Sequence, residues 1–503
     1  MTAPLVWIGI PIGLAVLLFI LPRERLVSYL GTLFALALAG IAYWIPPGAA
    51  QRIGAFSLRI DPSISLFGRQ ISLDAGDQTL LILVYGMAAF WFFGTLAVGA
   101  ARRVVSLGLV IIALLVASLA VRPFLYAALF IEIAVLVSVP LLASSPTRRA
   151  TPSGNPDDIR PGAGKSPQQS GAGLLRFLIY QTLAMPFILL AGFLLSGVEA
   201  GPADVAQVVQ AGILLLIGFA FLLAVFPLNT WIPMLAEESS PYAVGFILTI
   251  LTTFGLVLAL NFIDRFTWLR DSAQLPAILQ TVGMLTAVTA GIWAAFQRHL
   301  GRIAAYAIIA ETGISLLAMS LPDRQVGLQI LFYLFIPRAL ALGVWMMSIS
   351  ILKRHAGELR FAAVQGLARQ YPVAAAGVVF ANLALAGTPL LAAFPVRQAL
   401  WENLAAQSIP LALWFGLASL GLWIVALRSL AVLTLFLEKA QPAPRSPEGP
   451  APRSPEGWAS RETWPQRILI GIGLFGLFLS GLFPQWAQPL LANLPSMFEY
   501  LGK

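Results

Sequence analysis

Apolar runs of about 20 residues recur along the whole chain, and this spacing limits it to one class of fold. A helix of about 20 residues crosses roughly 30 Å of hydrocarbon, and its backbone satisfies its own hydrogen bonds there. Only 11% of the 503 residues are charged and 59% are hydrophobic, whereas soluble domains carry about 25% charged residues. The sequence predicts an all-α polytopic membrane protein with about fourteen transmembrane helices, at 4–21, 27–45, 78–98, 104–121, 124–143, 173–196, 207–226, 241–263, 276–297, 303–321, 326–352, 372–403, 408–437 and 466–486.

Lys and Arg are spread unevenly between alternate loops, which predicts an orientation. The first run starts MTAPLVW, without a basic segment before it, so we expect a spanning helix and not a signal peptide. With the amino terminus outside, most basic residues fall in inside loops, including Arg102, Arg103, Lys353 and Arg354. The positive-inside rule then puts both termini on the non-cytoplasmic side of a prokaryotic inner membrane. It also explains the net charge of +9 without nucleic acid as a partner.

Redox cofactors are not expected on this chain. It has no cysteine, which excludes thiolate-held iron–sulfur clusters and covalently attached haem. The histidines are His299 and His355, and both stand among basic residues in predicted inside loops. We therefore expect solvated histidines, no metal site and no cofactor, with any electron transfer performed by partners.

Two segments rich in Pro, Gly, Ser and charge, 145–172 and 438–465, are predicted to be disordered inside loops. The second contains PAPRSPEG twice, either as a tolerated local duplication or as a polyproline docking site. In the outside loop, FSLRI and QISL are expected to form a short hairpin. The other predicted divisions are 1–98 for the first three helices with that loop, 99–144 and 173–263 for a first repeat, 264–437 for a linking helix and a second repeat, and 466–503 for the last helix and tail.

Ionisable residues inside the apolar runs are the strongest functional signal. A charge at the bilayer centre costs about 2.5–3.5 kcal/mol, so it persists when it is paired, hydrated or useful. Glu132 lies in the middle of FLYAALFIEIAVLVSVPLL, and Glu311, Arg338 and Arg397 interrupt three later runs. Any one of them could be a structural ion pair. Four on separate helices favour a path for protons or other ions.

Prolines break two apolar runs in comparable ways. The segments LLAVFPLNTWIP and LALAGTPLLAAFPVR each place prolines inside a run, where proline removes a backbone hydrogen bond. Broken helices in corresponding positions are typical of transporters built from two inverted repeats. We therefore expect two inverted five-helix repeats, each with a broken helix. Two ordinary proline kinks are the alternative.

Three segments resemble motifs of one family. FPLNTWIPMLAEESSP, FQRHLGRIAAYAIIAETGISLLAMS and LALAGTPLLAAFPVRQALW occur in that order. They are similar to motifs of the antiporter-like, proton-translocating membrane subunits of respiratory complex I and of their relatives in cation/proton antiporters. Within the family the M and N types of NADH-quinone oxidoreductase subunit are the most similar. The matching broken-helix signature consists of Pro227, Trp231, Pro233, Pro241, Pro389 and Pro395.

The resemblance also implies functional positions, and several are altered. Glu132 corresponds to a glutamate that the family pairs with a lysine, but Leu222 stands at that lysine's position. A second lysine position holds Thr253, which can relay a proton only through its hydroxyl and water, or bond back to its own helix. Glu311 stands at a histidine position and Arg397 at a lysine position, and arginine stays protonated.

The predicted proton pathway is therefore Glu132, Thr253, Glu311, Arg338 and Arg397, in modified form. We expect a non-redox membrane-arm subunit of an NADH–quinone-oxidoreductase-like complex that contributes to proton translocation while other membrane and peripheral subunits transfer electrons. A non-pumping structural subunit of such a complex is the alternative. A Mrp-type cation/proton antiporter is a third reading, which the missing lysines oppose.

Overall fold

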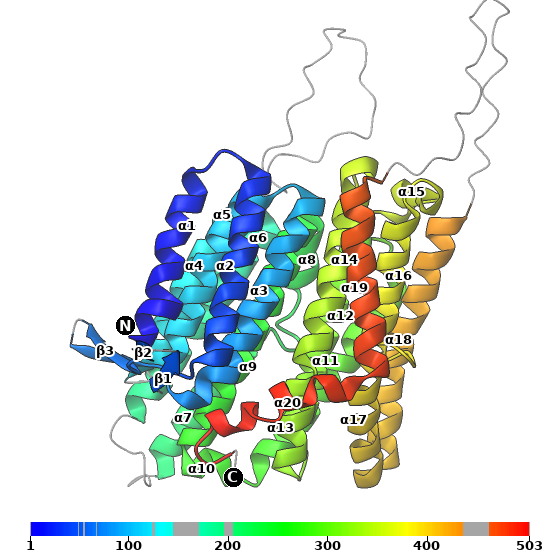
Figure 1. Cartoon of the computed structure of the whole chain (residues 1–503). Helices are drawn as coiled ribbons and strands as arrows, with labels where there is room; N and C mark the ends of the chain where they lie inside the picture. The colour runs from blue at the N-terminus through cyan, green and yellow to red at the C-terminus, as the bar shows by residue number, and fades with distance from the viewer. Residues whose placement is uncertain are drawn as a thin grey trace, which may run out of the picture.

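The computed structural model of the chain describes residues 2–48, 50–53, 56–66, 68–122, 126–143, 171–195, 205–435 and 462–501. Long helices lie side by side in one bundle (Figure 1). Among the described residues, ten helices are long and apolar enough to cross a membrane, and four shorter apolar helices accompany them. Each of the predicted runs contains one of these helices, so their positions are confirmed. The count of fourteen membrane crossings stays a prediction.

The helices of the amino-terminal half lie in the blue to green part of Figure 1. The chain enters through a single π-helical turn at Leu5–Gly9, which continues into the first α-helix. The α-helices of this half are α1 (Ile10–Ile20), α2 (Glu24–Trp44), α3 (Gln78–Val98), α4 (Ala101–Ala120), α5 (Ala127–Leu142), α6 (Ala172–Leu194), α7 (Val205–Leu222), α8 (Trp231–Glu238) and α9 (Pro241–Arg265).

The carboxyl-terminal half continues in green to red. Its α-helices are α10 (Thr267–Arg270), α11 (Gln274–Phe296), α12 (Leu300–Met319), α13 (Arg324–Tyr333), α14 (Phe335–Ala356), α15 (Phe361–Val364), α16 (Pro372–Ala386), α17 (Phe394–Gln407), α18 (Ile409–Thr434), α19 (Trp464–Leu482) and α20 (Gln488–Leu491). The C-terminal end returns to the first half, since the Asp264 carboxylate of α9 accepts hydrogen bonds from the backbone of Glu499, Tyr500 and Leu501.

Inner and outer helices differ in burial although both are apolar. In α9, 94% of the most apolar window is buried inside the protein, and in α12 and in the span that contains α14 the share is 83%. In α2, α6, α11 and α18 the share is 39%. Leu17, Phe193 and Leu413 are examples of large apolar side chains that are mostly exposed. An apolar surface of this extent is typical of a bundle surrounded by lipid or by other subunits.

Short strands form two sheets in the loop that was expected to hold one hairpin. Strands β1 (Ala50–Ile53) and β2 (Phe56–Arg59) pair with each other, and β3 (Ser63–Leu66) pairs with β4 (Arg69–Ser72), which also pairs with β5 (Val121–Arg122). The expected partners FSLRI and QISL therefore lie in different sheets. The pairing was wrong because each segment pairs with a strand only a few residues away in the sequence.

Both predicted helix breaks are present. One separates α7 from α8, and the other separates α16 from α17. Pro227 lies in the first break and Pro389 in the second, while Trp231 and Pro241 are the first residues of α8 and α9. Pro233 and Pro395 lie in the first turns of α8 and α17. Backbone N–H groups in a first turn have no acceptor within the helix, so proline costs no hydrogen bond there. The inverted relation between the two five-helix sets stays a prediction.

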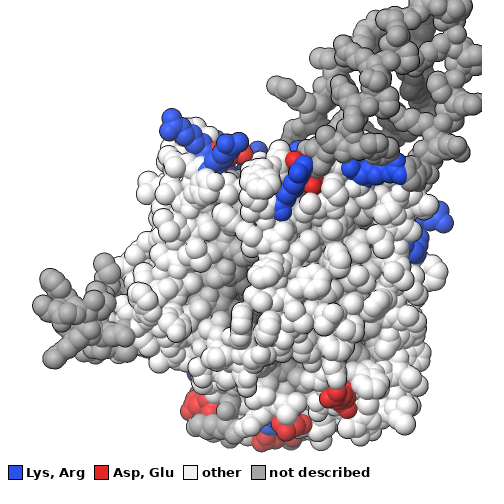
Figure 2. Space-filling view, turned by 45° about the vertical axis from the view of Figure 1, so that its right-hand side comes forward, with Lys and Arg blue, Asp and Glu red and all other residues white. Residues whose placement is uncertain are grey.

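Charge separates the two ends of the bundle. Figure 2 shows Lys and Arg along one edge and mainly Asp and Glu along the opposite edge. The two ends of the chain are marked in the lower half of Figure 1, away from the turn that joins α1 to α2. The predicted inside loops 145–172 and 438–465, with the repeated PAPRSPEG, lie almost wholly outside the described residues.

Candidate functional site

The first helix break is closed by neutral groups. Ending α7 at Leu222 frees backbone groups that need partners in a membrane. The Gln181 side chain of α6 donates to the Leu222 carbonyl at 3.2 Å, and the Phe226 N–H donates to Thr286 of α11 at 3.1 Å. Trp231 is buried against the Phe177 ring, with the two centroids 5.2 Å apart. Among the described residues, this break is held by amide, hydroxyl and ring contacts.

Glu132 is the acidic group of the first half that was predicted to take part in a pathway. It lies on α5 and is half-buried, and Thr182 of α6 donates to its Oε1 at 2.8 Å. Its Oε2 is buried and has no hydrogen-bond partner among the described residues. Sequence reasoning left open which cation could replace the missing lysine. The partner found is a threonine hydroxyl, so the described residues provide Glu132 with a hydrogen bond and no ion pair.

Thr253 does not join a polar chain in the structure. It is buried on α9 and donates to the Thr249 carbonyl at 2.8 Å, and Thr249 in turn donates to the Gly245 carbonyl at 2.7 Å. Such bonds to the preceding turn are the usual alternative for threonine inside a helix. The structure does not bring Thr253 into contact with Glu132, Glu311 or Arg397.

The second helix break carries a charge into the bundle. Gly387 ends α16 with φ +80°, a left-handed conformation that favours glycine. A Cβ at this position would lie 2.8 Å from Cδ of Arg397, so the glycine also leaves room for the arginine stem. The chain then turns through Pro389 and begins α17 at Phe394, which places Arg397 in the first turn of that helix. Arg397 is only 3% exposed.

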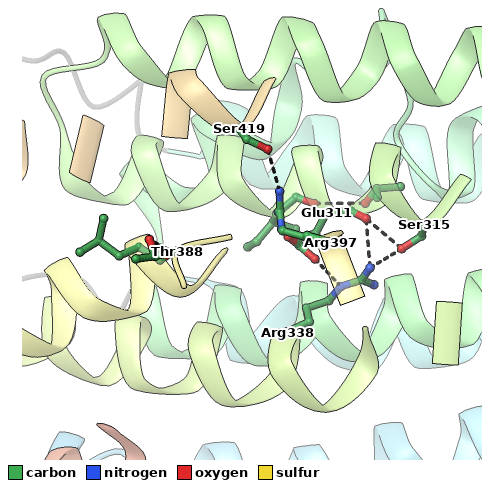
Figure 3. Close-up of polar contacts among 9 residues, drawn as sticks. Glu311, Ser315, Arg338, Thr388, Arg397 and Ser419 are labelled. Atoms are coloured by element: carbon green, nitrogen blue, oxygen red, sulfur yellow. Dashed lines mark hydrogen bonds and ion pairs between the residues drawn. The ribbon is translucent and has the colours of Figure 1, made fainter. Parts of the chain in front are cut away.

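Glu311, Arg338 and Arg397 meet at one point between α12, α14 and α17 (Figure 3). Arg397 donates to Oε1 of Glu311 and forms an ion pair with it. Arg338 donates to the Glu311 carbonyl at 3.0 Å, and its Nε lies 3.5 Å from Oε2 of the same side chain. The three predicted residues of the second half therefore form one cluster, which we call the Glu311 cluster.

Two serines complete the Glu311 cluster, and sequence reasoning missed both. Arg338 also donates to the hydroxyl of Ser315, one turn after Glu311 on α12. Arg397 donates to Ser419 of α18 at 3.4 Å. The spacing of Ser315 from Glu311 could have identified the first, because residues four apart share a helix face. Nothing in the sequence points to Ser419, since its role depends on how α17 packs against α18.

The charges in the Glu311 cluster do not balance. Glu311 is 1% exposed and Arg338 is 2% exposed. Arginine is always protonated in proteins, so two positive charges face one carboxylate. No other acidic side chain of the described residues forms an ion pair with either arginine. Glu311 is therefore a single carboxylate held between two guanidinium groups.

A cavity of about 540 Å³ opens at the start of α12. The residues that line it do not belong to the Glu311 cluster. Arg298, His299, Arg302, Arg360 and Glu237 contribute to its lining. Arg302 and Arg360 pair with Glu237 at 2.9 and 3.8 Å. Burial lowers the pKa of His299 to about 4, and the neutral ring accepts a hydrogen bond from the Arg302 N–H at 3.3 Å. His299 is thus a neutral helix cap at neutral pH.

The fold and the buried charges define an integral membrane protein with a helix break in each half and an ion cluster beside the second break. A family described as NADH:quinone oxidoreductase/Mrp antiporter, transmembrane, matches residues 162–422. The chain belongs to this family.

Two relatives illustrate the match. NADH-quinone oxidoreductase subunit N 2 of Acidobacterium capsulatum is 27% identical over 292 residues, which cover 54% of this chain and 57% of that protein. NAD(P)H-quinone oxidoreductase subunit 2 of Thermosynechococcus vestitus is 22% identical over 67% of this chain and 68% of its own length. The chain thus spans 57% of the length of the first relative and 68% of that of the second.

Solved structures agree in fold over nearly the whole chain. A chain of the Mrp complex from Dietzia sp. superposes with a TM-score of 0.77 at 17% identity and covers 99% of this chain and 97% of that chain. A chain of respiratory complex I from Thermus thermophilus gives 0.72 at 20% identity, with coverages of 99% and 100%. A chain of an archaeal membrane-bound sulfane sulfur reductase gives 0.76 at 17% identity, with coverages of 100% and 98%. The fold is therefore shared by respiratory and antiporter complexes.

Proposed function

We propose that this chain is one membrane subunit of an NADH–quinone-oxidoreductase-type complex in a prokaryotic inner membrane. The family match and the relatives named subunit N and subunit 2 support this proposal. Other membrane and peripheral subunits hold the cofactors and transfer the electrons, and this chain holds none. The basic edge of the bundle faces the cytoplasm and the amino terminus faces outward, in keeping with the positive-inside rule.

Within such a complex, the non-pumping structural role is the version that the geometry supports best. The observation that carries it is Glu311 held between two arginines. A proton path needs groups that change protonation, and neither guanidinium does so. In the first half Leu222 cannot titrate and Thr253 bonds to its own helix. The subunit then completes the membrane arm without conducting protons along its centre.

Proton conduction by a modified route is the second candidate, and Glu132 is the observation in its favour. Its carboxylate lies within a predicted membrane span and keeps one oxygen without a partner among the described residues. A carboxylate so placed can exchange a proton with water or with a group on a neighbouring subunit. This version requires Glu132 to titrate during turnover.

Replacing Glu132 by Gln in the complex separates the two versions. The complex is reconstituted in vesicles and the number of protons moved per electron is measured. The structural role predicts an unchanged ratio, and a clear fall supports conduction through Glu132. Glu402→Gln is the matched control, because Glu402 is an exposed glutamate on α17 that accepts a hydrogen bond from Gln398 of its own helix.

Extraction in mild detergent tests membership of a complex. A tag on this chain should recover other membrane and peripheral subunits together with quinone-reductase activity. A chain that is recovered without quinone-reductase activity, and that exchanges sodium for protons in vesicles together with its partners, would contradict this proposal and support the Mrp-type antiporter.

A further inference from the structure

Several N–H groups of the Glu311 cluster have no acceptor. Nε and Nη1 of Arg338 and Nε of Arg397 are buried and make no hydrogen bond to any described residue. Oε2 of Glu311 lies 3.5 Å from Nε of Arg338, in ion-pair range but outside hydrogen-bond geometry. Buried N–H donors of charged groups normally have a hydrogen-bond acceptor, since a buried donor without one is costly in free energy. The cluster therefore has unused hydrogen-bonding capacity on both arginines.

The same cluster carries one uncompensated positive charge. Arg338 and Arg397 contribute two charges that do not titrate, and Glu311 contributes one of opposite sign. The start of α17 adds to the positive potential, because Arg397 lies in its first turn, where backbone N–H groups carry partial positive charge. A water molecule could accept the free N–H groups, but it could not balance the charge.

We propose that the Glu311 cluster binds one small monovalent anion of the halide class, with chloride as the physiological ion. The anion lies beside both guanidinium groups and accepts from the N–H groups of Arg338 and Arg397 that have no other acceptor. It brings the net charge of the cluster to zero. The second helix break is then stabilised by four charged groups, of which three belong to this chain.

Size favours a monatomic ion over a larger anion. Glu311, Arg338 and Arg397 are each no more than 3% exposed, so the site is enclosed by protein. The two cavities described in the structure are lined by other residues and do not reach the cluster. A phosphate or carboxylate ligand has several heavy atoms and would need such a cavity, whereas a halide ion is a single atom.

Chloride dependence of stability is the first test. The full chain, within its complex, is unfolded thermally in detergent while sodium chloride replaces sodium gluconate at constant ionic strength. A ligand that binds only the folded state raises the unfolding midpoint in a saturable way, and we expect a rise of a few degrees. Bromide in place of chloride should give the same rise and an anomalous scattering peak beside the two arginines.

Two variants assign the effect to this site. In Arg338→Met, Glu311 and Arg397 remain as a pair of opposite charges, and methionine fills a volume similar to that of the arginine it replaces. The unfolding midpoint of this variant should therefore not respond to chloride. Arg428→Met is the control, because Arg428 of α18 contacts the Ala295 carbonyl and the Phe361 ring at a distance from the cluster. It should keep the full chloride response.

Three results would overturn the proposal. They are a wild-type midpoint that is the same in chloride and gluconate, a bromide peak found only elsewhere, and an equal chloride response in Arg338→Met. The wild-type measurements need no variant to fold. None of these results depends on proton movement or on which complex contains the chain, so the anion site and the proposed function can fail separately.

Discussion

The two helix breaks of this protein have the same form but different chemistry. The break between α7 and α8 is closed by Gln181 and Thr286, which are neutral, and the aligned lysine position holds Leu222. The break between α16 and α17 lies beside three buried charges, on Glu311, Arg338 and Arg397. A proline break therefore creates backbone groups that need partners, but it does not determine whether those partners carry charge.

The two helix breaks are stabilised by interactions of different strength. In the first half, hydrogen bonds of about 0.5–1.5 kcal/mol each are enough to hold the broken helix. In the second half, charges that each cost about 2.5–3.5 kcal/mol to bury are retained. Arg338 and Arg397 keep their charge, so under the proposed structural role the second break is held by buried charges and the first by neutral contacts. Mutations in matched positions of the two halves can test this contrast.

The largest effect is expected from Glu311→Gln. It leaves two arginines facing a neutral amide, and removing one partner of a buried ion pair typically costs about 3–5 kcal/mol. Glu132→Gln is the matched change in the first half, where only a hydrogen bond from Thr182 is affected, and it should cost about 1 kcal/mol or less. Unfolding midpoints in detergent measure both. Equal losses would show that the two halves do not differ in this way.

A lysine restored to the first break should destabilise the protein. Leu222 is buried, and its side chain lies beside Gly255 of α9, so Leu222→Lys places a cation among apolar groups at a cost of about 2.5–3.5 kcal/mol. Glu132 already bonds to Thr182 of α6. We therefore expect the double variant with Glu132→Gln to show a coupling energy below about 0.5 kcal/mol.

Strong coupling between residues 132 and 222 would have a different meaning. It would show that Glu132 reaches across to the new lysine and that the first half retains a pairing site. Leu222→Met, which is similar in size and apolar, is the control and should have little effect.

The positions of the helices were predictable from the sequence, and most contacts within the site were not. Hydropathy located the apolar helices, since the apolar runs of the sequence are about as long as a bilayer is thick, and the prolines at 227, 389 and 395 located both breaks. The charged residues of the second half were found because an ionisable group in an apolar run stands out. That they form one cluster depends on how α12, α14 and α17 are rotated against each other, which a sequence pattern does not record.

Polar residues in the first half were harder to interpret. Thr253 was predicted to support a water path, yet threonine can equally bond to the carbonyl four residues before it, and it does so here. The sequence did not predict that Thr182 is the hydrogen-bond partner of Glu132, because threonine is common in membrane helices. Sequence reasoning thus identified the charged group but not the neutral group that holds it.

Gly387→Ala tests how the second break makes room for its charge. Alanine at φ +80° is strained, and its Cβ would lie 2.8 Å from the Arg397 stem, so we expect a loss of about 1–2 kcal/mol. Gly416→Ala on α18 is the control, since nothing lies within 4 Å of the added carbon. It should leave stability unchanged or raise it slightly. A harmless Gly387→Ala would mean that Arg397 is not confined by the turn.

The smallest effect is expected from the pH dependence that His299 contributes at the start of α12. Its pKa in the folded protein is about 4, below the ordinary value of 6.5, because burial disfavours the charged ring. The unfolded chain therefore binds a proton between pH 6.5 and 4 that the folded chain does not, so stability is complete above pH 6.5 and is lost as the pH falls toward 4. Partial exposure limits this loss to about 1 kcal/mol.

His299→Asn keeps a cap acceptor for the Arg302 N–H without titrating, so its unfolding midpoint should fall less between pH 7 and 4.5 than that of the wild type. The charged groups near this ring are present in both proteins; they are Glu237, Arg302, Lys353 and Arg360. Identical pH profiles would show that the His299 ring is solvated and contributes nothing to folding.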